Sequence, residues 1–496
     1  MVNGPEAFTP DNEFCLDETE VDGFFVAAGF SAHGIAGAGG IGRVLAEWVV
    51  QGEPSLDVRH MDVRRFGPHY RSPGYTLART VETYETYYDI RHPRQSRRAG
   101  RPLRTSPVFS WHVEHGAELG EKAGWERVEH YRPHEAAGDE SLRPHGWAGR
   151  LWSPAVGVEH RATREAAGLF DQSSFAKISV RGPDAEPLLE WLCAGRVGRG
   201  VGRITYTQLL NARGGVEADV TVTRWAPDEF VLVTGTASGP LDLSWLRRHA
   251  RRRSADVRID DVTGQWACFC LWGPGSRDVL APLSGCDLGD ESFPFMSARQ
   301  TTVGDVPVRA QRVSFVGELG WELYAPTVYG TRLWDPLWAA GHEHGLVAAG
   351  YQAIESLRLE RGYRVWGREL TPETTPYEAG VGFAVRLDKQ GGFLGADRLR
   401  SAGAPTRRLR CLLLDDPLAV ALGGEPVRAA GPGAGDGEVV GRVTSGGYGY
   451  TLRRSVAYAY LPAAADIGTR VAVGIDGSWA EGVVTTDPPL PSMPSE

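Results

Sequence analysis

The order of strand-like and helix-like patterns constrains this chain more than any other feature of its sequence. Alternating apolar and polar residues predict strands at 176–181, 219–223 and 230–234, and helical spacing predicts helices at 185–193, 331–344 and 352–362. Beyond about residue 408 only short strands separated by glycines remain, as at 440–448 and 470–474. This order predicts an α+β fold that ends in a small β-barrel.

The length of 496 residues exceeds what one hydrophobic core supports, so several domains are expected. Changes of pattern divide the chain into four parts. We expect a tail with a small strand, turn and helix at 1–66, and a middle linker module of α+β type at 67–150. The main α+β domain then covers 151–404, and the C-terminal barrel covers 405–496.

The charge and cysteine content exclude several classes of protein. A net charge of -9 argues against nucleic-acid binding, and the basic run at 247–253 is interpreted as a solvated helix face. No apolar run approaches about 20 residues and no targeting segment begins the sequence, so we expect a cytoplasmic protein with no membrane partner. The six scattered cysteines fit a reducing compartment.

Two side-chain groups contain residue types that bind metals. Cys268 and Cys270 share one face of a predicted strand, where a buried structural pair is the default interpretation. His112 and His115 flank Glu114, but this spacing is shorter than the helical HExxH motif and lacks a third ligand. We therefore expect no metal site.

A G-x-G-x-x-G motif runs from Gly37 to Gly42, after a strand predicted to be buried at 21–29. The residues at 34–42 are predicted to form a glycine-rich turn, and those at 43–50 a helix. A dinucleotide site also needs a second strand that ends in an acidic residue, whereas the segment at 58–63 is strongly polar. We therefore expect no nicotinamide or flavin binding by this motif, and interpret it as a packing or docking element.

The segment at 200–224 places a strand, a glycine turn and a second strand in hairpin order. Asp219 is predicted at the mouth of the second strand, four residues beyond the turn glycines. Aspartate is unfavourable inside strands, so it needs a polar partner or a function there. From the residues alone, a functional carboxylate and a strand-entry residue that bonds local backbone N–H groups both stay open.

Four motifs in a fixed order indicate a family. They are the glycine turn with Asp219, SFVGELGWELY at 314–324, SLRLERGY at 356–363 and WGRELTPETTPYEAG at 366–380. With them the chain resembles the folate-binding domain of the glycine-cleavage T-protein, an aminomethyltransferase. It is more closely similar to the C-terminal two-thirds of dimethylglycine and sarcosine dehydrogenases, over about residues 13–488. The part at 24–66 resembles the last portion of their flavin domain, so 1–66 is interpreted as a truncated remnant of an FAD-dependent oxidoreductase domain.

The resemblance implies roles for individual residues. Asp219 corresponds to the catalytic carboxylate, and Glu322 to the acid that pairs with the pterin ring. The other implied cofactor-binding residues are Tyr206, Phe175, Phe315, Arg358 and Trp366. Two positions depart from the T-protein: Phe315 replaces a tyrosine and Ile354 replaces an arginine. We expect folate binding to survive both changes, but not the use of a lipoyl-protein substrate.

The resemblance thus implies a tetrahydrofolate-dependent transferase of methyl, methylene or aminomethyl units, with Asp219 hydrogen-bonded to the reacting folate nitrogen. Since the flavin-binding half is lacking in this sequence, we expect no bound FAD and no oxidative step of its own. The partner is then a small-molecule one-carbon donor or acceptor, which the sequence leaves unnamed, as it does the oligomeric state. Two alternatives stay open: a subunit of a flavin-dependent amine dehydrogenase that needs a flavoprotein partner, and a non-catalytic folate-binding protein.

Overall fold

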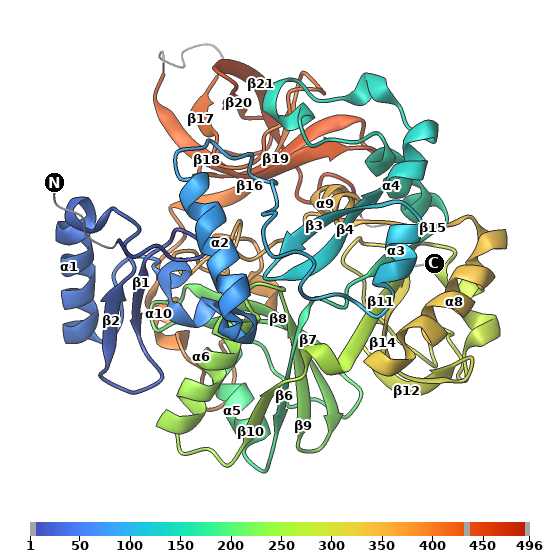
Figure 1. Ribbon diagram of the computed structural model, residues 1–496, viewed down its shortest axis with the longest axis horizontal. Helices are drawn as coiled ribbons and strands as arrows, with labels where there is room; N and C mark the ends of the chain where they lie inside the picture. Colours follow the sequence, from blue (N-terminus) through green and yellow to red (C-terminus); the bar gives the residue numbers. More distant parts are fainter. Residues whose placement is uncertain (1–5, 431–436, 492–496) are drawn as a thin grey trace.

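The computed structural model describes residues 6–430 and 437–491, arranged as Figure 1 shows. Two β-sheets form the body of the molecule, the C-terminal barrel lies at one end, and a small N-terminal unit lies at the side. This agrees with the predicted α+β fold and its terminal barrel. Within the described ranges no helix is both long and apolar enough to cross a bilayer.

The N-terminal unit consists of an antiparallel pair, β1 (Cys15–Glu18) and β2 (Phe25–Ala28), and the helix α1 (Gly34–Gln51). Val44 and Trp48 of α1 pack against Leu16 and Val58. The predicted buried strand at 21–29 is wrong in extent and burial, because β2 has four residues, two of which are exposed. A two-stranded sheet has only one small face to bury, so β2 stays near the surface.

The prediction of a glycine-rich turn at 34–42 is also wrong, because these residues form the first half of α1. Each glycine costs a helix about 1 kcal/mol relative to alanine, and the packing of Val44 and Trp48 offsets this. A Cβ on Gly37 would lie 2.8 Å from the side chain of Ile41, so Gly37 has a packing role. The G-x-G-x-x-G motif therefore lies inside a helix and does not form a strand-to-helix phosphate turn.

The middle of the chain crosses from this unit to the body. Two 3-10 turns, η1 (Arg59–Met61) and η2 (Val63–Arg65), follow α1 in place of a second strand. Then come α2 (Pro73–Glu85), α3 (Phe109–Glu114) and an antiparallel pair, β3 (Ala117–Lys122) with β4 (Trp125–Tyr131).

The first sheet of the body has the strand order β10-β6-β9-β8-β7. Its strands are β6 (Ala176–Arg181), β7 (Ile204–Leu210), β8 (Val216–Ala226), β9 (Glu229–Thr234) and β10 (Arg258–Asp261). One face is covered by α5 (Ala185–Leu192) and α6 (Gly239–Arg252), which bury the alternate residues of β8 in one apolar cluster. The other face of β8 therefore carries Glu217, Asp219 and Thr221.

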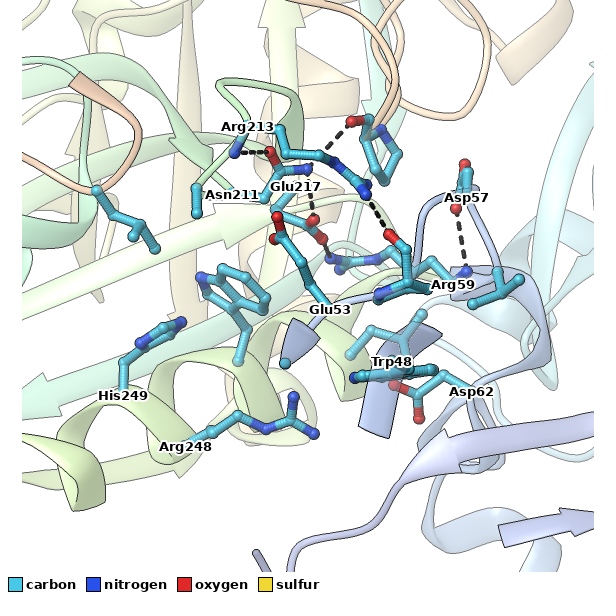
Figure 2. A pocket seen from close by; sticks show the side chains of 18 of the residues that line it. Trp48, Glu53, Asp57, Arg59, Asp62, Asn211, Arg213, Glu217, Arg248 and His249 are labelled. Carbon is cyan, nitrogen blue, oxygen red and sulfur yellow. Dashed lines mark hydrogen bonds and ion pairs between the residues drawn. The ribbon is translucent and has the colours of Figure 1, made fainter. Parts of the chain in front are cut away.

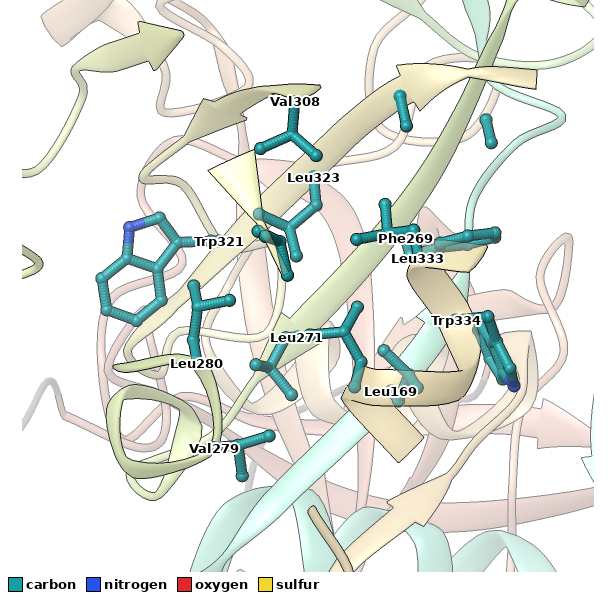
Figure 3. Close-up of a cluster of buried hydrophobic side chains, with 14 of the residues drawn as sticks. Leu169, Phe269, Leu271, Val279, Leu280, Val308, Trp321, Leu323, Leu333 and Trp334 are labelled. Atoms are coloured by element: carbon teal, nitrogen blue, oxygen red, sulfur yellow. The ribbon is translucent and has the colours of Figure 1, made fainter. Parts of the chain in front are cut away.

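The second sheet has the order β12-β13-β14-β11-β5-β15. Its strands are β5 (Ala167–Asp171), β11 (Trp266–Trp272), β12 (Ala298–Val303), β13 (Val306–Gln311), β14 (Gly320–Pro326) and β15 (Leu346–Ala348). The helices around it are α4 (Ala155–Glu165), α7 (Ser276–Leu280), α8 (Gly330–Gly341) and α9 (Tyr351–Glu360). Figure 3 shows Phe269 and Leu271 of β11 packed beside Trp321, Leu323 and Trp334 in its main core.

The central strand β11 is buried on both faces, which explains its continuous apolar sequence. Phe269 and Leu271 face the main core, while Cys268 and Cys270 face a second cluster that also contains residues of β9 and α9. The two thiols lie 3.9 Å apart and fully buried, as the sequence predicted for a structural pair.

After α10 (Ala396–Ser401) the chain forms a closed barrel of order β16-β19-β18-β17-β20-β21. The strands are β16 (Arg407–Leu414), β17 (Pro426–Ala429), β18 (Val439–Gly449), β19 (Arg454–Pro462), β20 (Arg470–Ile475) and β21 (Ser478–Thr485). Closure leaves no free sheet edge. The helix α9 packs against β18, which fixes the barrel to the body.

Candidate functional site

Asp219 lies inside β8, directly opposite Gln208 of β7. The prediction placed it at the mouth of the strand, which is wrong, because β8 begins at Val216 and Asp219 is its fourth residue. The amide Nε2 of Gln208 donates to Asp219 Oδ1 over 3.0 Å. Asp219 therefore has the side chain of Gln208 as its partner, whereas the alternative interpretation had it bonding backbone N–H groups of its own strand.

The surroundings of Asp219 favour its protonated form. Burial raises the pKa of Asp219 to about 7, although hydrogen bonds from Gln208 and Tyr206 lower it, and the nearby carboxylate of Asp242 raises it further. Tyr206 precedes Gln208 by two residues on β7, so both side chains point to the face that carries Asp219. The ring of Tyr206 stacks on Phe383 with 6.0 Å between centroids.

Glu322 lies on β14 of the other sheet, and its carboxyl, like that of Asp219, has a strongly raised pKa. Burial raises the pKa of Glu322 to about 7, and the hydroxyl of Tyr324 and the charge of Lys177 oppose this shift. Tyr324 donates to Glu322 Oε2 over 2.6 Å. Among the described residues no protein group bonds Oε1, so this oxygen is free to accept from a ligand.

A direct contact joins the two sheets between these carboxylates. Thr223 of β8 donates to Gln311 of β13 over 3.1 Å, and Gln311 is the cross-strand partner of Glu322. Asp219 and Glu322 therefore lie on elements that pack against each other.

Two of the aromatic residues predicted to bind the cofactor, Phe175 and Phe315, gather in one cluster. They pack with Ile354 into the group that contains Tyr324 and the cysteine pair, whereas Tyr206 stacks on Phe383. The ring of Phe175 meets Tyr351 edge-on at 6.4 Å, and that of Phe315 lies 5.7 Å from Tyr363. These aromatic rings give the flat walls that a heterocycle requires.

Arg358 is not brought to this cluster. Its guanidinium is fully buried and bonds Glu355, Glu369 and the carbonyl of Tyr363. Glu369 in turn accepts from Thr444 of the barrel. Arg358 thus holds α9 to the loop that contains Tyr363 and Glu369 and, through Glu369, to the barrel. Its nitrogen atoms are occupied by protein groups.

Trp366 likewise lies outside the cluster that contains Phe175 and Phe315. Its indole Nε1 donates to the carbonyl of Val216 over 3.0 Å, at the start of the strand that carries Asp219. The guanidinium of Arg59 lies 4.8 Å from its ring centre. Trp366 therefore positions the beginning of β8.

Three family profiles match the sequence in consecutive segments. The GCVT N-terminal domain matches residues 108–389, the Glycine cleavage T-protein C-terminal barrel domain matches 407–490, and the FAD dependent oxidoreductase central domain matches 51–106. The chain belongs to the glycine cleavage T-protein family. This confirms the resemblance inferred from the four motifs, and the family is one of folate-dependent aminomethyltransferases.

Individual relatives divide into two kinds. The chain is 39% identical over 470 residues to 4-methylaminobutanoate oxidase (formaldehyde-forming) of Paenarthrobacter nicotinovorans, covering 94% of this chain and 56% of that protein. It is 34% identical to mitochondrial dimethylglycine dehydrogenase of Rattus norvegicus, covering 100% and 57%. Aminomethyltransferase of Symbiobacterium thermophilum is 32% identical, with 78% and 97% covered. The chain thus spans about half the length of the oxidase and dehydrogenase relatives.

A solved structure supports the same family. Aminomethyltransferase T of the glycine cleavage system from Bartonella henselae superposes with a TM-score of 0.66 at 27% identity, covering 78% of this chain and 98% of that chain. The T-protein architecture therefore extends over both sheets and the barrel.

Several residues next to Asp219 were missed by the sequence reasoning. Arg59 of η1 donates to Glu217 over 2.8 Å and forms a second ion pair with Asp242 of α6. Asp242 also accepts from Thr234 over 2.7 Å. These partners lie 158 and 183 residues from Arg59, so no local pattern could have revealed them.

The basic run on α6 is not a fully solvated helix face, which corrects the prediction for 247–253. Arg248 is 8% exposed and donates to the carbonyl of Glu18 over 2.7 Å, and Arg252 pairs with the Glu18 carboxylate. These cations fix β1 of the N-terminal unit to α6, because β1 and the loop after it carry several acids.

The histidines rejected as metal ligands have ordinary partners. His112 Nε2 lies 2.9 Å from Asp171, and its Nδ1 lies 2.8 Å from the hydroxyl of Tyr131. His115 stacks on Trp111. In the part of the chain that the structure describes, no group of three His, Cys, Asp or Glu residues could hold a metal ion.

Proposed function

We propose that this chain is a tetrahydrofolate-dependent one-carbon transferase in which Asp219 is the catalytic acid or base. The observation that carries the proposal is the half-buried carboxylate of Asp219, held by Gln208 and given a pKa of about 7 by its surroundings. A group with this pKa can accept and return a proton near neutral pH with little free-energy cost. The T-protein family of the chain supplies the reaction class.

The residues fit the folate that this family uses. Glu322 offers Oε1 to the adjacent N–H donors of a pterin edge while Tyr324 holds Oε2. Phe175 and Phe315 supply apolar walls for the ring. Tetrahydrofolate, when bound, supplies the nitrogen atoms that carry the one-carbon unit.

Within this proposal Asp219 hydrogen-bonds the reacting nitrogen and takes up the proton that it releases. Gln208 holds one carboxylate oxygen, which fixes the direction in which the proton is accepted. The apolar Ile354 lies where the T-protein has an arginine, and Phe315 lies where it has a tyrosine. We infer that the donor or acceptor is a small molecule rather than a lipoyl protein.

One experiment tests this function directly. The purified chain is titrated with tetrahydrofolate and assayed for one-carbon exchange with small N-methyl and N-aminomethyl compounds. We expect Asp219→Asn to bind folate and lose turnover. The control Asp228→Asn, at an exposed aspartate in the turn between β8 and β9, should behave as the unchanged protein. Full activity of Asp219→Asn would exclude the assigned role.

A second candidate is a subunit of a flavin-dependent amine dehydrogenase. The match of residues 51–106 to an FAD dependent oxidoreductase domain, and the similarity to dimethylglycine dehydrogenase, favour it. Yellow colour, or a flavoprotein that co-purifies with the chain, would support it. A colourless species with its own turnover would exclude it.

A third candidate is a non-catalytic folate-binding protein. It is favoured by 32% identity to the mitochondrial pyruvate dehydrogenase phosphatase regulatory subunit of Mus musculus, which covers 98% of this chain. Folate binding without exchange for any donor would support this candidate.

A further inference from the structure

Lysine is rare in this chain, and Lys177 of β6 is its most deeply buried example. Only three of the 53 basic residues are lysines, at positions 122, 177 and 389. Lys177 is 1% exposed. Lysine side chains are almost never fully buried unless they are paired, so the partners of Lys177 decide what it does.

The ammonium group of Lys177 is bonded by two backbone carbonyls. Its Nζ donates to the carbonyl of Ser173 and to that of Phe175, each over 2.9 Å. Both carbonyls belong to the loop between β5 and β6, and Phe175 is one of the aromatic walls assigned to the folate ring. In the same loop, Ser174 bonds the hydroxyl of Tyr351 over 3.1 Å. Lys177 thus fixes the loop that presents Phe175.

The charge of Lys177 is not matched by an acid at ion-pair distance among the described residues. Other buried cations of the chain have such an acid. Lys389 also donates to two carbonyls, but it pairs with Glu190 over 2.7 Å. Figure 2 shows Arg59 beside Glu217, to which it donates over 2.8 Å. The charge of Lys177 is therefore left to act on groups further away.

The register of the first sheet places Lys177 on the face that carries Asp219. Lys177 pairs with Val233 of β9, and Val233 pairs with Thr221 of β8. Thr221 lies two residues from Asp219, so all four side chains point to one face. Val233 packs in the cluster that also contains residues of the second sheet. Lys177 therefore lies between the two sheets, on the side toward Glu322.

Glu322 is the carboxylate on which this charge acts. Burial raises the pKa of Glu322, the hydrogen bond from Tyr324 lowers it, and the positive charge of Lys177 lowers it further. Burial also lowers the pKa of Lys177 itself. The neighbouring groups that oppose this are Cys268, Asp171, Asp261 and Cys270. Lys177 and Glu322 form no ion pair, so the charge acts on Glu322 through space.

We propose that Lys177 is a positioning residue of the folate site, which fixes the loop that carries Phe175 and places a positive charge near Glu322. This inference rests on the proposed function, because it gives Lys177 a part in binding the pterin ring. The ionised form of Glu322 is the stronger acceptor for the pterin N–H groups. Lys177 thus extends folate binding to lower pH than Glu322 alone permits.

Two substitutions separate the charge of Lys177 from its hydrogen bonds. Lys177→Gln removes the charge and keeps N–H donors, whereas Lys177→Met removes both. Each is titrated with tetrahydrofolate between about pH 5 and pH 9. The pH at which the affinity falls to half should rise by about one unit in both variants. At about pH 9 Lys177→Gln should match the unchanged protein, and Lys177→Met should bind more weakly because the loop is released.

Two controls exclude a general loss of structure. Lys389→Met removes the other buried lysine that bonds carbonyls, so it should lower Tm without moving the pH dependence of folate affinity. In the Glu322→Gln background the carboxylate is absent. There Lys177→Gln should cause no further pH-dependent loss of affinity. A shift that persists in this background would assign the charge to a group other than Glu322 and overturn the inference.

Infrared titration of the folate-free chain observes Glu322 directly. The carboxylic acid band that Glu322→Gln lacks belongs to this side chain, and its midpoint should lie about one pH unit higher in Lys177→Gln than in the unchanged protein. If the chain binds no tetrahydrofolate, the proposed function fails, and this measurement still tests the charge assigned to Lys177. An equal midpoint in Lys177→Gln and the unchanged protein, or an equal shift in Lys389→Met, overturns the inference.

Discussion

The side-chain amide of Gln208 donates to Oδ1 of Asp219 over 3.0 Å across the β7–β8 pair. This hydrogen bond favours the ionised carboxylate and opposes the effect of burial on its pKa. In Gln208→Leu, burial acts with less opposition, and the pKa of Asp219 should rise above about 7. The acid limb of the pH–rate profile should then move to higher pH, with kcat at its plateau reduced less than in Asp219→Asn. A limb that does not move would show that a group other than Asp219 determines it.

The substitution Asp219→Asn should lower kcat by about 10²–10⁴-fold, because positioned proton transfer contributes that much to a rate. The affinity for tetrahydrofolate should change little, since Glu322 and the aromatic walls remain. Single-turnover kinetics with folate in excess would separate the two effects. Loss of affinity together with an unchanged single-turnover rate would move Asp219 from chemistry to binding.

The same variant tests the burial of Asp219 through protein stability. The folded-state pKa of about 7 lies above the unfolded value of about 3.9, so the folded chain holds this proton more tightly. Stability is therefore lost as pH rises from about 4 to 7, by up to about 4 kcal/mol above pH 7. Asp219→Asn lacks this loss, so its advantage in Tm over the unchanged protein should grow from pH 4 to pH 8. An advantage that is constant with pH would contradict the raised pKa.

Ionisation of Glu322 should make the affinity for tetrahydrofolate increase as pH rises. Only the ionised carboxylate presents both oxygens as charged acceptors, and burial raises the pKa of Glu322 to about 7. The affinity for tetrahydrofolate should therefore fall below about pH 7. Glu322→Gln should lose roughly 1.5–3 kcal/mol of binding, the usual worth of a charged hydrogen bond. The exposed Glu343→Gln serves as the control, and equal losses in both variants would dismiss the pterin contact.

The parts of the fold that the sequence predicted are those governed by local periodicity. The strand at 176–181 and the helix at 185–193 were predicted to within one residue, because their apolar residues pack on a single neighbouring layer. The glycine-rich half of α1 was missed because tertiary packing of Val44 and Trp48 outweighs the poor helix propensity of glycine. Propensity therefore failed where long-range contacts provide the stabilisation.

The site shows the same division. The glycine turn and strand pattern that single out Asp219 lie within residues 200–224, and the family resemblance that assigns its role rests on further motifs as far as residue 380. Arg358 also lies in a family motif, and its pair with Glu355 is a local i,i+3 contact on α9. Its contact with Glu369 forms only when the loop after α9 folds back, so the motif did not reveal that its guanidinium is occupied. Arg59 carries no motif, and its contacts with Glu217 and Asp242 join two segments that the sequence keeps far apart.

The ion pairs of Arg59 lead to the last prediction, which concerns the junction of the oxidoreductase-type segment with the transferase domain. The Arg59 side chain is 9% exposed and that of Asp242 is 1% exposed, so removing the cation leaves a buried carboxylate without its partner. Such a change costs about 3–5 kcal/mol. Arg59→Met should therefore lower Tm strongly, whereas Arg181→Met, at an exposed pair with Glu229, should change stability by less than about 1 kcal/mol. Arg59→Met leaves both Glu217 and Asp242 without their cation, and the double variant with Asp242→Asn removes the more deeply buried of these two charges, so it should recover part of the loss. If the double variant is no more stable than Arg59→Met, the unpaired Asp242 is not the cause, and the destabilisation comes from the loss of the Glu217 pair and of packing on Trp366.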